Sequence, residues 1–181
     1  MHDINVMPVT GEVTYARGDN SSYETGLWSY SDRSKETVVP GYYRTHLSRY
    51  NVDVELTATK RVGFHKYTYL SDEKPSIVFD MVNGGCWDKP TETLVRIVND
   101  STINGYRYSK GWANDQKVFF HAEFSRKFDG VEFIVDGKTL NDAKEGKGEK
   151  MFARVNFAQN DSKPIYCLLY TSPSPRDRSL S

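Results

Sequence analysis

The chain has 181 residues and a mass of 20.7 kDa, and its 24 basic and 24 acidic residues cancel to a formal net charge of zero. This balance argues against a nucleic-acid backbone or an anionic membrane as the partner, and no apolar run approaches the roughly 20 residues of a membrane helix. An aromatic content of 13% is too high for general disorder and favours strands over helices.

The apolar residues after Thr37 recur mostly at every second position, which predicts strands rather than helices. Residues 14–35 precede this region, have no sustained period, and are expected to form a long loop. Residues 51–62 alternate between apolar and polar side chains, as a strand with one wet face does. Further strands are expected at 64–70 and 76–82, and the three together predict a meander.

The second half of the chain repeats this pattern of short strands and turn residues. Strands are expected at 93–98, 102–108, 117–124, 131–135 and 151–157, with the first two paired as a hairpin and the next two as another pair. Asp136-Gly137 is a tight-turn dipeptide, and residues 141–150 are expected to form a charged loop. About eight or nine such strands favour an all-β fold, an antiparallel β-sandwich of two sheets, because so wide a sheet needs its apolar face covered.

The C-terminus differs from the rest in composition. Pro164 to Cys167 is followed by Leu-Leu-Tyr-Thr and then Ser-Pro-Ser-Pro-Arg-Asp-Arg-Ser, which resembles translated sequencing-adapter sequence. Such a composition is typical of a disordered segment. We therefore expect a domain over residues 1–167 and a non-native, disordered tail from Leu168 to Ser181.

Motifs that specify catalysis or metal binding are missing. None of the four histidines has metal-site spacing, and the two cysteines, Cys86 and Cys167, form no CxxC pair. Cys86 lacks the flanking residues of a nucleophile. Carboxylates that lie in or beside the strands are plentiful, yet sequence spacing does not show which of them converge. We assign no catalytic residue and no metal ligand.

The densest polar and aromatic segment is residues 105–116, which reads Gly-Tyr-Arg-Tyr-Ser-Lys-Gly-Trp-Ala-Asn-Asp-Gln. Flat rings beside polar side chains are the groups that stack on sugar rings and bind hydroxyls, while its two glycines are expected to let the backbone bend between strands. The same residues also fit a structural cluster of packed rings and ion pairs. The candidates for substrate or interdomain contacts are Arg107, Trp112, Asp115 and Gln116.

Five stretches, in order, resemble the N-terminal domain of glycoside hydrolase family 92, the calcium-dependent exo-acting α-mannosidases. They are INVMPVTG (4–11), PGYY (40–43), VDVELTATKRVGFH (52–65), IVNDSTINGYR (97–107) with Ser109 and WANDQ (112–116), and FFHAEFSRKF (119–128). The third stretch is the strongest piece. The resemblance covers most of residues 3–167.

The resemblance implies a sandwich of the galactose-mutarotase-like type, a supersandwich that packs on a larger (α/α)6 domain. It implies an inverting enzyme that removes terminal mannose from α-mannoside glycans, with Ca²⁺ holding sugar hydroxyls. The catalytic carboxylates and calcium ligands belong to the helical domain, so none is transferred to this chain. We therefore expect a truncated N-terminal module, inactive alone, from a periplasmic or secreted bacterial enzyme whose C-terminal helical domain is its partner.

A free-standing carbohydrate-binding β-sandwich is the alternative function. The high aromatic content fits such a module equally well, and catalytic motifs are missing. The longer genomic reading frame separates the two. A helical domain downstream favours the hydrolase, and a stop codon near residue 170 favours the binding module.

Overall fold

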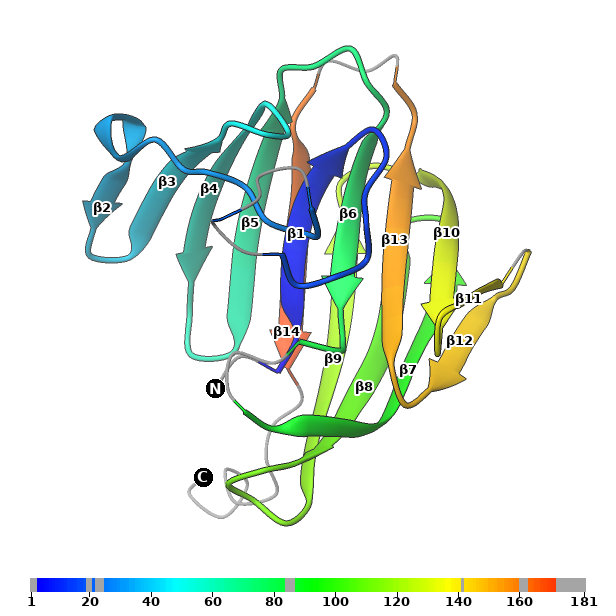
Figure 1. Ribbon diagram of the computed structural model, residues 1–181. Helices are drawn as coiled ribbons and strands as arrows, with labels where there is room; N and C mark the ends of the chain where they lie inside the picture. The colour runs from blue at the N-terminus through cyan, green and yellow to red at the C-terminus, as the bar shows by residue number, and fades with distance from the viewer. Residues whose placement is uncertain are drawn as a thin grey trace.

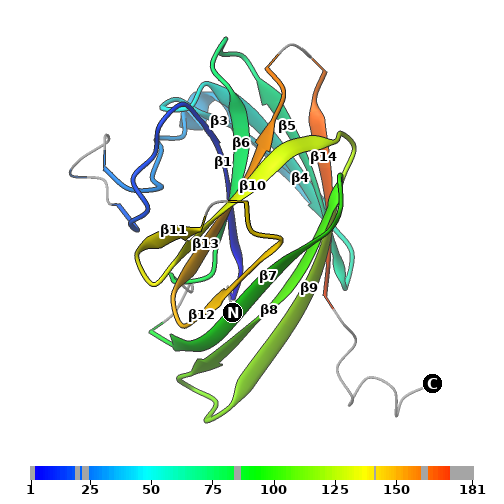
Figure 2. The ribbon, with the colours of Figure 1, turned by 90° about the vertical axis from the view of Figure 1, so that its right-hand side faces the viewer.

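The computed structural model describes residues 3–18, 21, 25–83, 87–140, 142–159 and 163–171. Within these residues the chain forms fourteen strands and one short 3-10 turn, η1 (Arg33–Lys35). The strands make two antiparallel sheets that lie face to face (Figures 1 and 2), which confirms the expected all-β sandwich. No helix in the described part of the chain is long and apolar enough to cross a membrane.

The smaller sheet has five strands. Their order is β1 (Asn5–Thr10), β6 (Pro75–Asp80), β13 (Met151–Phe157), β10 (Phe128–Val135) and β11 (Lys138–Leu140). All six residues of β6 are buried, so this strand is covered on both faces. β6 lies between β1 and β13 at the centre of the molecule (Figure 1), a position in which a strand is buried on both faces.

The larger sheet has nine strands. Their order is β12 (Glu145–Gly148), β7 (Lys89–Asn99), β8 (Thr102–Lys110), β9 (Gln116–Phe124), β14 (Ile165–Thr171), β5 (Val62–Tyr69), β4 (Val52–Ala58), β3 (Tyr42–Leu47) and β2 (Thr37–Val39). Val52 and Val54 are buried and Asp53 between them is not, as the alternation predicts. The inward residues of both sheets form the core.

Aromatic rings join the two sheets across this core. Phe79 of β6 stacks on Phe120 of β9 with ring centroids 5.6 Å apart, and Phe124 meets Phe157 edge to face at 5.4 Å. Buried phenylalanines of this kind remove large apolar areas from water, which is the main stabilising contribution to a sandwich.

Two predicted pairings are wrong. Residues 76–82 do not extend the meander, because β6, the strand in that region, crosses to the smaller sheet, where its fully buried side chains find cover on both faces. Residues 117–124 and 131–135 lie in different sheets, since the chain passes between the layers at 124–128. There the Phe128 amide donates to the Asp100 carbonyl, and the Phe124 and Phe128 rings meet edge to face.

The loops agree in part with the expectation. The described portion of residues 14–35 contains only η1 and one isolated bridge, as a long loop should. Asp136 and Gly137 both have positive φ, 49° and 81°, and connect β10 to β11 as the predicted tight turn. The segment 141–150 is not wholly a loop, because its residues Glu145–Gly148 form β12 on the edge of β7.

The prediction of a disordered tail from Leu168 onward is wrong for the first four residues of that segment. Strand β14 continues to Thr171 and lies inside the larger sheet, where Leu168 pairs with Phe64 of β5 and with Glu123 of β9. The physical reason is position: a strand with neighbours on both sides gains two ladders of hydrogen bonds. Residues 172–181 lie outside the described part of the chain.

Candidate functional site

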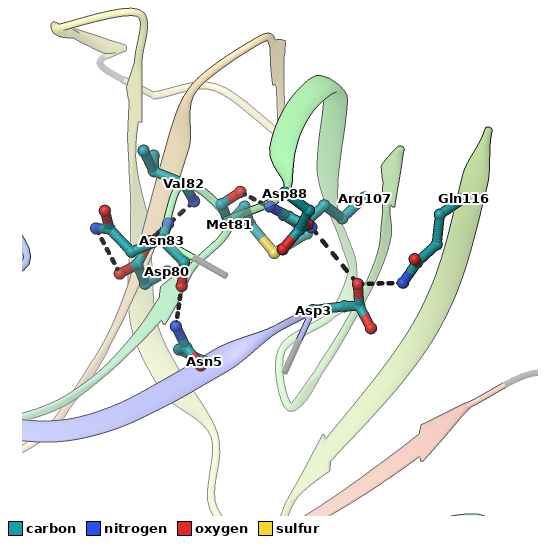
Figure 3. Close-up of polar contacts among 9 residues, drawn as sticks. All are labelled: Asp3, Asn5, Asp80, Met81, Val82, Asn83, Asp88, Arg107 and Gln116. Atoms are coloured by element: carbon teal, nitrogen blue, oxygen red, sulfur yellow. Dashed lines mark hydrogen bonds and ion pairs between the residues drawn. The ribbon is translucent and has the colours of Figure 1, made fainter. Parts of the chain in front are cut away.

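Arg107 is the centre of a buried polar network at one end of the sandwich. It lies on β8 among the inward residues, and its side chain has no exposed surface. Its Nε donates to the Met81 carbonyl at 2.9 Å, and its Nη1 donates to Asp88 Oδ2 at 2.5 Å (Figure 3). A charge held without water in this way needs close partners, and these contacts supply them.

Asp3 joins the network from the N-terminus. Its Oδ1 lies 3.5 Å from Arg107 Nη1 and also accepts a hydrogen bond from the Gln116 side-chain amide. The network therefore ties the residues before β1 to β8, to the start of β9 and to the segment before β7 (Figure 3). Among the described residues Arg107 Nη2 has no hydrogen-bond partner.

Asp80 shapes the end of β6 next to this network. Its Oδ1 accepts hydrogen bonds from the Val82 and Asn83 amides, and its Oδ2 accepts one from the Asn83 side chain. The Asn5 side chain in turn donates to the Asn83 carbonyl (Figure 3). Burial raises the pKa of Asp80, and the hydrogen bonds from Asn83 oppose that rise.

Two tryptophans stand exposed beside the network. Trp112, in the turn between β8 and β9, is 76% exposed, and Trp87, just before β7, is 62% exposed. Their ring centroids are 5.9 Å apart with an interplanar angle of 51°. At their base, a Cβ on Gly111 would lie 2.6 Å from Asp88 Cβ, so the two segments touch closely.

The four predicted site residues therefore separate into two groups. Arg107 and Gln116 belong to the buried polar network. Such contacts fit the alternative interpretation of residues 105–116 as a structural cluster of packed rings and ion pairs. Trp112 is at the surface, and Asp115 is at the surface in an ion pair with Lys117 at 3.1 Å. Sequence analysis did not identify the network residues Asp3 and Asp88 or the exposed Trp87 beside Trp112. The alternation of side chains along a strand does indicate the burial of Arg107, because Arg107 lies on the same face of β8 as Ile103, which is fully buried.

Gly105 has a different role from the one predicted. It lies within β8 and not at a bend, and a Cβ there would come within 2.1 Å of the Leu94 carbonyl oxygen and 2.7 Å of the Phe120 ring. On the outer face beside it, Tyr106 and Tyr108 stack with centroids 4.4 Å apart. Tyr106 borders a shallow groove of about 440 Å³ over β7, β8, β9 and β14.

The other chemical candidates do not gather into a site. His65 Nδ1 lies 2.7 Å from the Tyr67 hydroxyl, and His121 lies 3.1 Å from Glu123 on the surface. Glu55 is engaged by Lys66 at 2.6 Å. Across the described ranges, no three His, Cys, Asp or Glu side chains come together as metal ligands would. Cys86 lies outside the described residues.

Comparison with known families decides the affiliation of this sandwich. The sequence model of the glycosyl hydrolase family 92 N-terminal domain matches residues 1–168. The chain belongs to glycosyl hydrolase family 92. The family 92 domain is thus almost the whole of the described chain, and its fold is the β-sandwich of that domain. No curated protein matches the chain.

Solved structures agree with this family 92 assignment. A family GH92 α-mannosidase from Bacteroides thetaiotaomicron superposes with a TM-score of 0.86 and 31% identity, over 94% of this chain and 24% of that chain. The same mannosidase in complex with mannoimidazole gives 0.86 and 30%, over 98% and 24%. A family GH92 inverting mannosidase from the same species, 17% identical with a TM-score of 0.77 over 96% and 22%, shares the fold. The chain spans about a quarter of the length of these relatives.

Proposed function

We propose that this chain is the non-catalytic N-terminal module of an inverting, calcium-dependent exo-α-mannosidase that acts on mannose-containing glycans. The observation that carries the proposal is the match of 94% of this chain to 24% of an α-mannosidase at 31% identity. A further solved neighbour with this fold is named as an inverting mannosidase. The partner of the module is a helical catalytic domain of the same polypeptide, and the enzyme is periplasmic or secreted.

The engagement of the carboxylates supports a non-catalytic role. Inversion requires one carboxylic acid and one carboxylate roughly 6.5–9.5 Å apart, with room for water between them. Asp88 is held by Arg107, Glu55 by Lys66 and Asp80 by the turn after β6. These three carboxylates take part in structural contacts, which supports a catalytic pair in the rest of the enzyme.

We propose that calcium binds in the rest of the enzyme. Ca²⁺ takes six to eight oxygen ligands from carboxylates, carbonyls and water. The described residues do not fit such a site, since no three acidic or histidine side chains meet there. In the whole enzyme, calcium bound there would supply a hard Lewis acid for sugar hydroxyls.

The test uses the purified 181-residue chain with an aryl α-mannoside and with α-mannobiose, each in calcium and in EDTA. We expect no release of mannose under any of these conditions, because the chain supplies no catalytic pair. Release that disappears in EDTA or on mutation of a carboxylate in this chain contradicts the proposal. A cooperative thermal transition of the same sample shows that the chain is folded.

A further inference from the structure

We propose that Trp87 and Trp112 form a glycan-binding platform on which one pyranose ring stacks. The choice of mannose as its sugar rests on the proposed function. The two indoles, the contact between them and the buried ion pair beneath them carry the argument.

Exposure of the two indoles is the first observation. Trp112 is 76% exposed and Trp87 is 62% exposed although each ring contacts the other. An exposed apolar surface rimmed by polar residues is a feature of binding sites. Indole faces are large and flat, and their negative π-faces suit the C–H groups on one side of a pyranose ring.

Rigidity is the second observation. Trp87 directly precedes Asp88, whose carboxylate is locked to the buried Arg107, and Trp112 directly follows Gly111, which lies against Asp88. The two tryptophans therefore stand on segments that touch at one buried residue. Holding the rings in place before binding lowers the entropy cost of binding, which is how rigid sugar sites gain affinity.

The polar surroundings are the third observation. Lys110, Asn114 and Asp115 are exposed around Trp112 and offer both donors and acceptors for hydroxyl groups. Lys117 pairs with Asp115 at 3.1 Å, so these two charges neutralise each other. A ligand with many hydroxyls fits this mixture of hydrogen-bond donors and acceptors.

The test observes the indole N–H signals of the three tryptophans by NMR during titration of the full chain with an α-linked mannotriose. We expect the signals of Trp87 and Trp112 to shift saturably, with a dissociation constant on the order of 1 mM, and the signal of Trp28 to stay in place. Mannitol carries similar hydroxyls without a ring and is expected to cause no shift.

Variants separate the platform from other surfaces. Trp112→Ala is expected to weaken binding at least about tenfold, and the unchanged Trp28 signal shows that the fold is intact. Tyr166→Ala is the matched control, because Tyr166 is an exposed aromatic residue of β14, a strand that does not carry the platform. It is expected to bind as the wild type does.

Three outcomes overturn the platform: no saturable shift with mannotriose, equal shifts with mannitol, or unchanged binding by Trp112→Ala. The first is also the result if the two indoles are instead covered by another part of a longer polypeptide. None of them bears on mannose release by an enzyme that contains this module. A failed platform and a failed function are therefore told apart by assaying binding and hydrolysis separately.

Discussion

Arg107 Nη1 lies 2.5 Å from Asp88 Oδ2, with 0% of the arginine side chain and 6% of the aspartate side chain exposed. This one ion pair connects an inner position of β8 to the segment before β7. It therefore supports both the packing of this end of the sandwich and the exposed tryptophans above it.

Removal of either partner is expected to be strongly destabilising. Arg107→Ala leaves the buried Asp88 carboxylate without its partner, and Asp88→Ala leaves buried Arg107 with only the longer contact to Asp3 at 3.5 Å. We expect each to lower the free energy of unfolding by about 3–5 kcal/mol in urea denaturation. The double variant Arg107→Met/Asp88→Leu is expected to be more stable than either single variant, because both members of the ion pair are removed together. Single variants as stable as the wild type contradict a buried pair.

Gly105 is expected to tolerate no side chain. Gly105→Ala places a methyl group against the Leu94 carbonyl oxygen and the Phe120 ring, and we expect a loss of about 1–3 kcal/mol from this overpacking. Gly130→Ala is the matched control, because a Cβ there has nothing within 4 Å. Chemical denaturation of the two variants should show a loss for the first alone, and equal effects would disprove the close approach at β8.

His65 is expected to make stability depend on pH. Burial lowers its pKa from the ordinary 6.5, so the folded state binds the proton more weakly than the unfolded state does. The stabilisation from neutral His65 is present above pH 6.5 and is lost as the pH falls from 6.5 through the folded-state pKa.

The measurement is the difference in unfolding free energy between pH 7.5 and pH 5.5. We expect His65→Gln to reduce this difference, since glutamine does not titrate. His121→Gln serves as control, because that ring is 38% exposed in the folded state. A pH difference in His65→Gln as large as in the wild type shows that His65 does not contribute to it.

The corrected C-terminal boundary predicts different outcomes for two truncations. A chain that ends at Thr171 keeps β14 whole, whereas a chain that ends at Cys167 loses the residues that pair with 62–64 and with 120–123. Because β14 lies between two strands, we expect the shorter chain to have a clearly lower melting temperature or to aggregate through the exposed edges. Equal melting temperatures for the two chains are inconsistent with a strand there.

Much of the fold was predictable because period-two alternation is a local signal. It predicted a strand over 51–62, of which Val52–Ala58 form β4, and there each inward valine is followed by a polar residue. The same signal fails for β6, where all six residues are buried and no alternation exists. It also fails for β14, where the low-complexity composition that follows obscured a strand whose partners come from distant parts of the chain.

The site was predicted less completely, and the reason is again distance along the chain. Residues 105–116 stood out through their composition, and all four of their candidates lie at this end of the sandwich. Asp3 and Asp88 have no local feature that connects them to Arg107. They come together because β7 pairs with β8 and because the sheet that contains β1 packs on the sheet that contains β7 and β8. Inward parity with Ile103 does indicate the burial of Arg107.

The most direct test of the central claim is the α-mannosidase activity of a hybrid enzyme. The segment of the Bacteroides thetaiotaomicron mannosidase that matches this chain is replaced by residues 3–168, and the same enzyme without that segment is the control. We predict that the hybrid releases mannose from an α-mannoside, with the β-anomer formed first and the activity lost in EDTA, while the control is inactive. A hybrid that melts cooperatively yet releases no mannose would contradict the account.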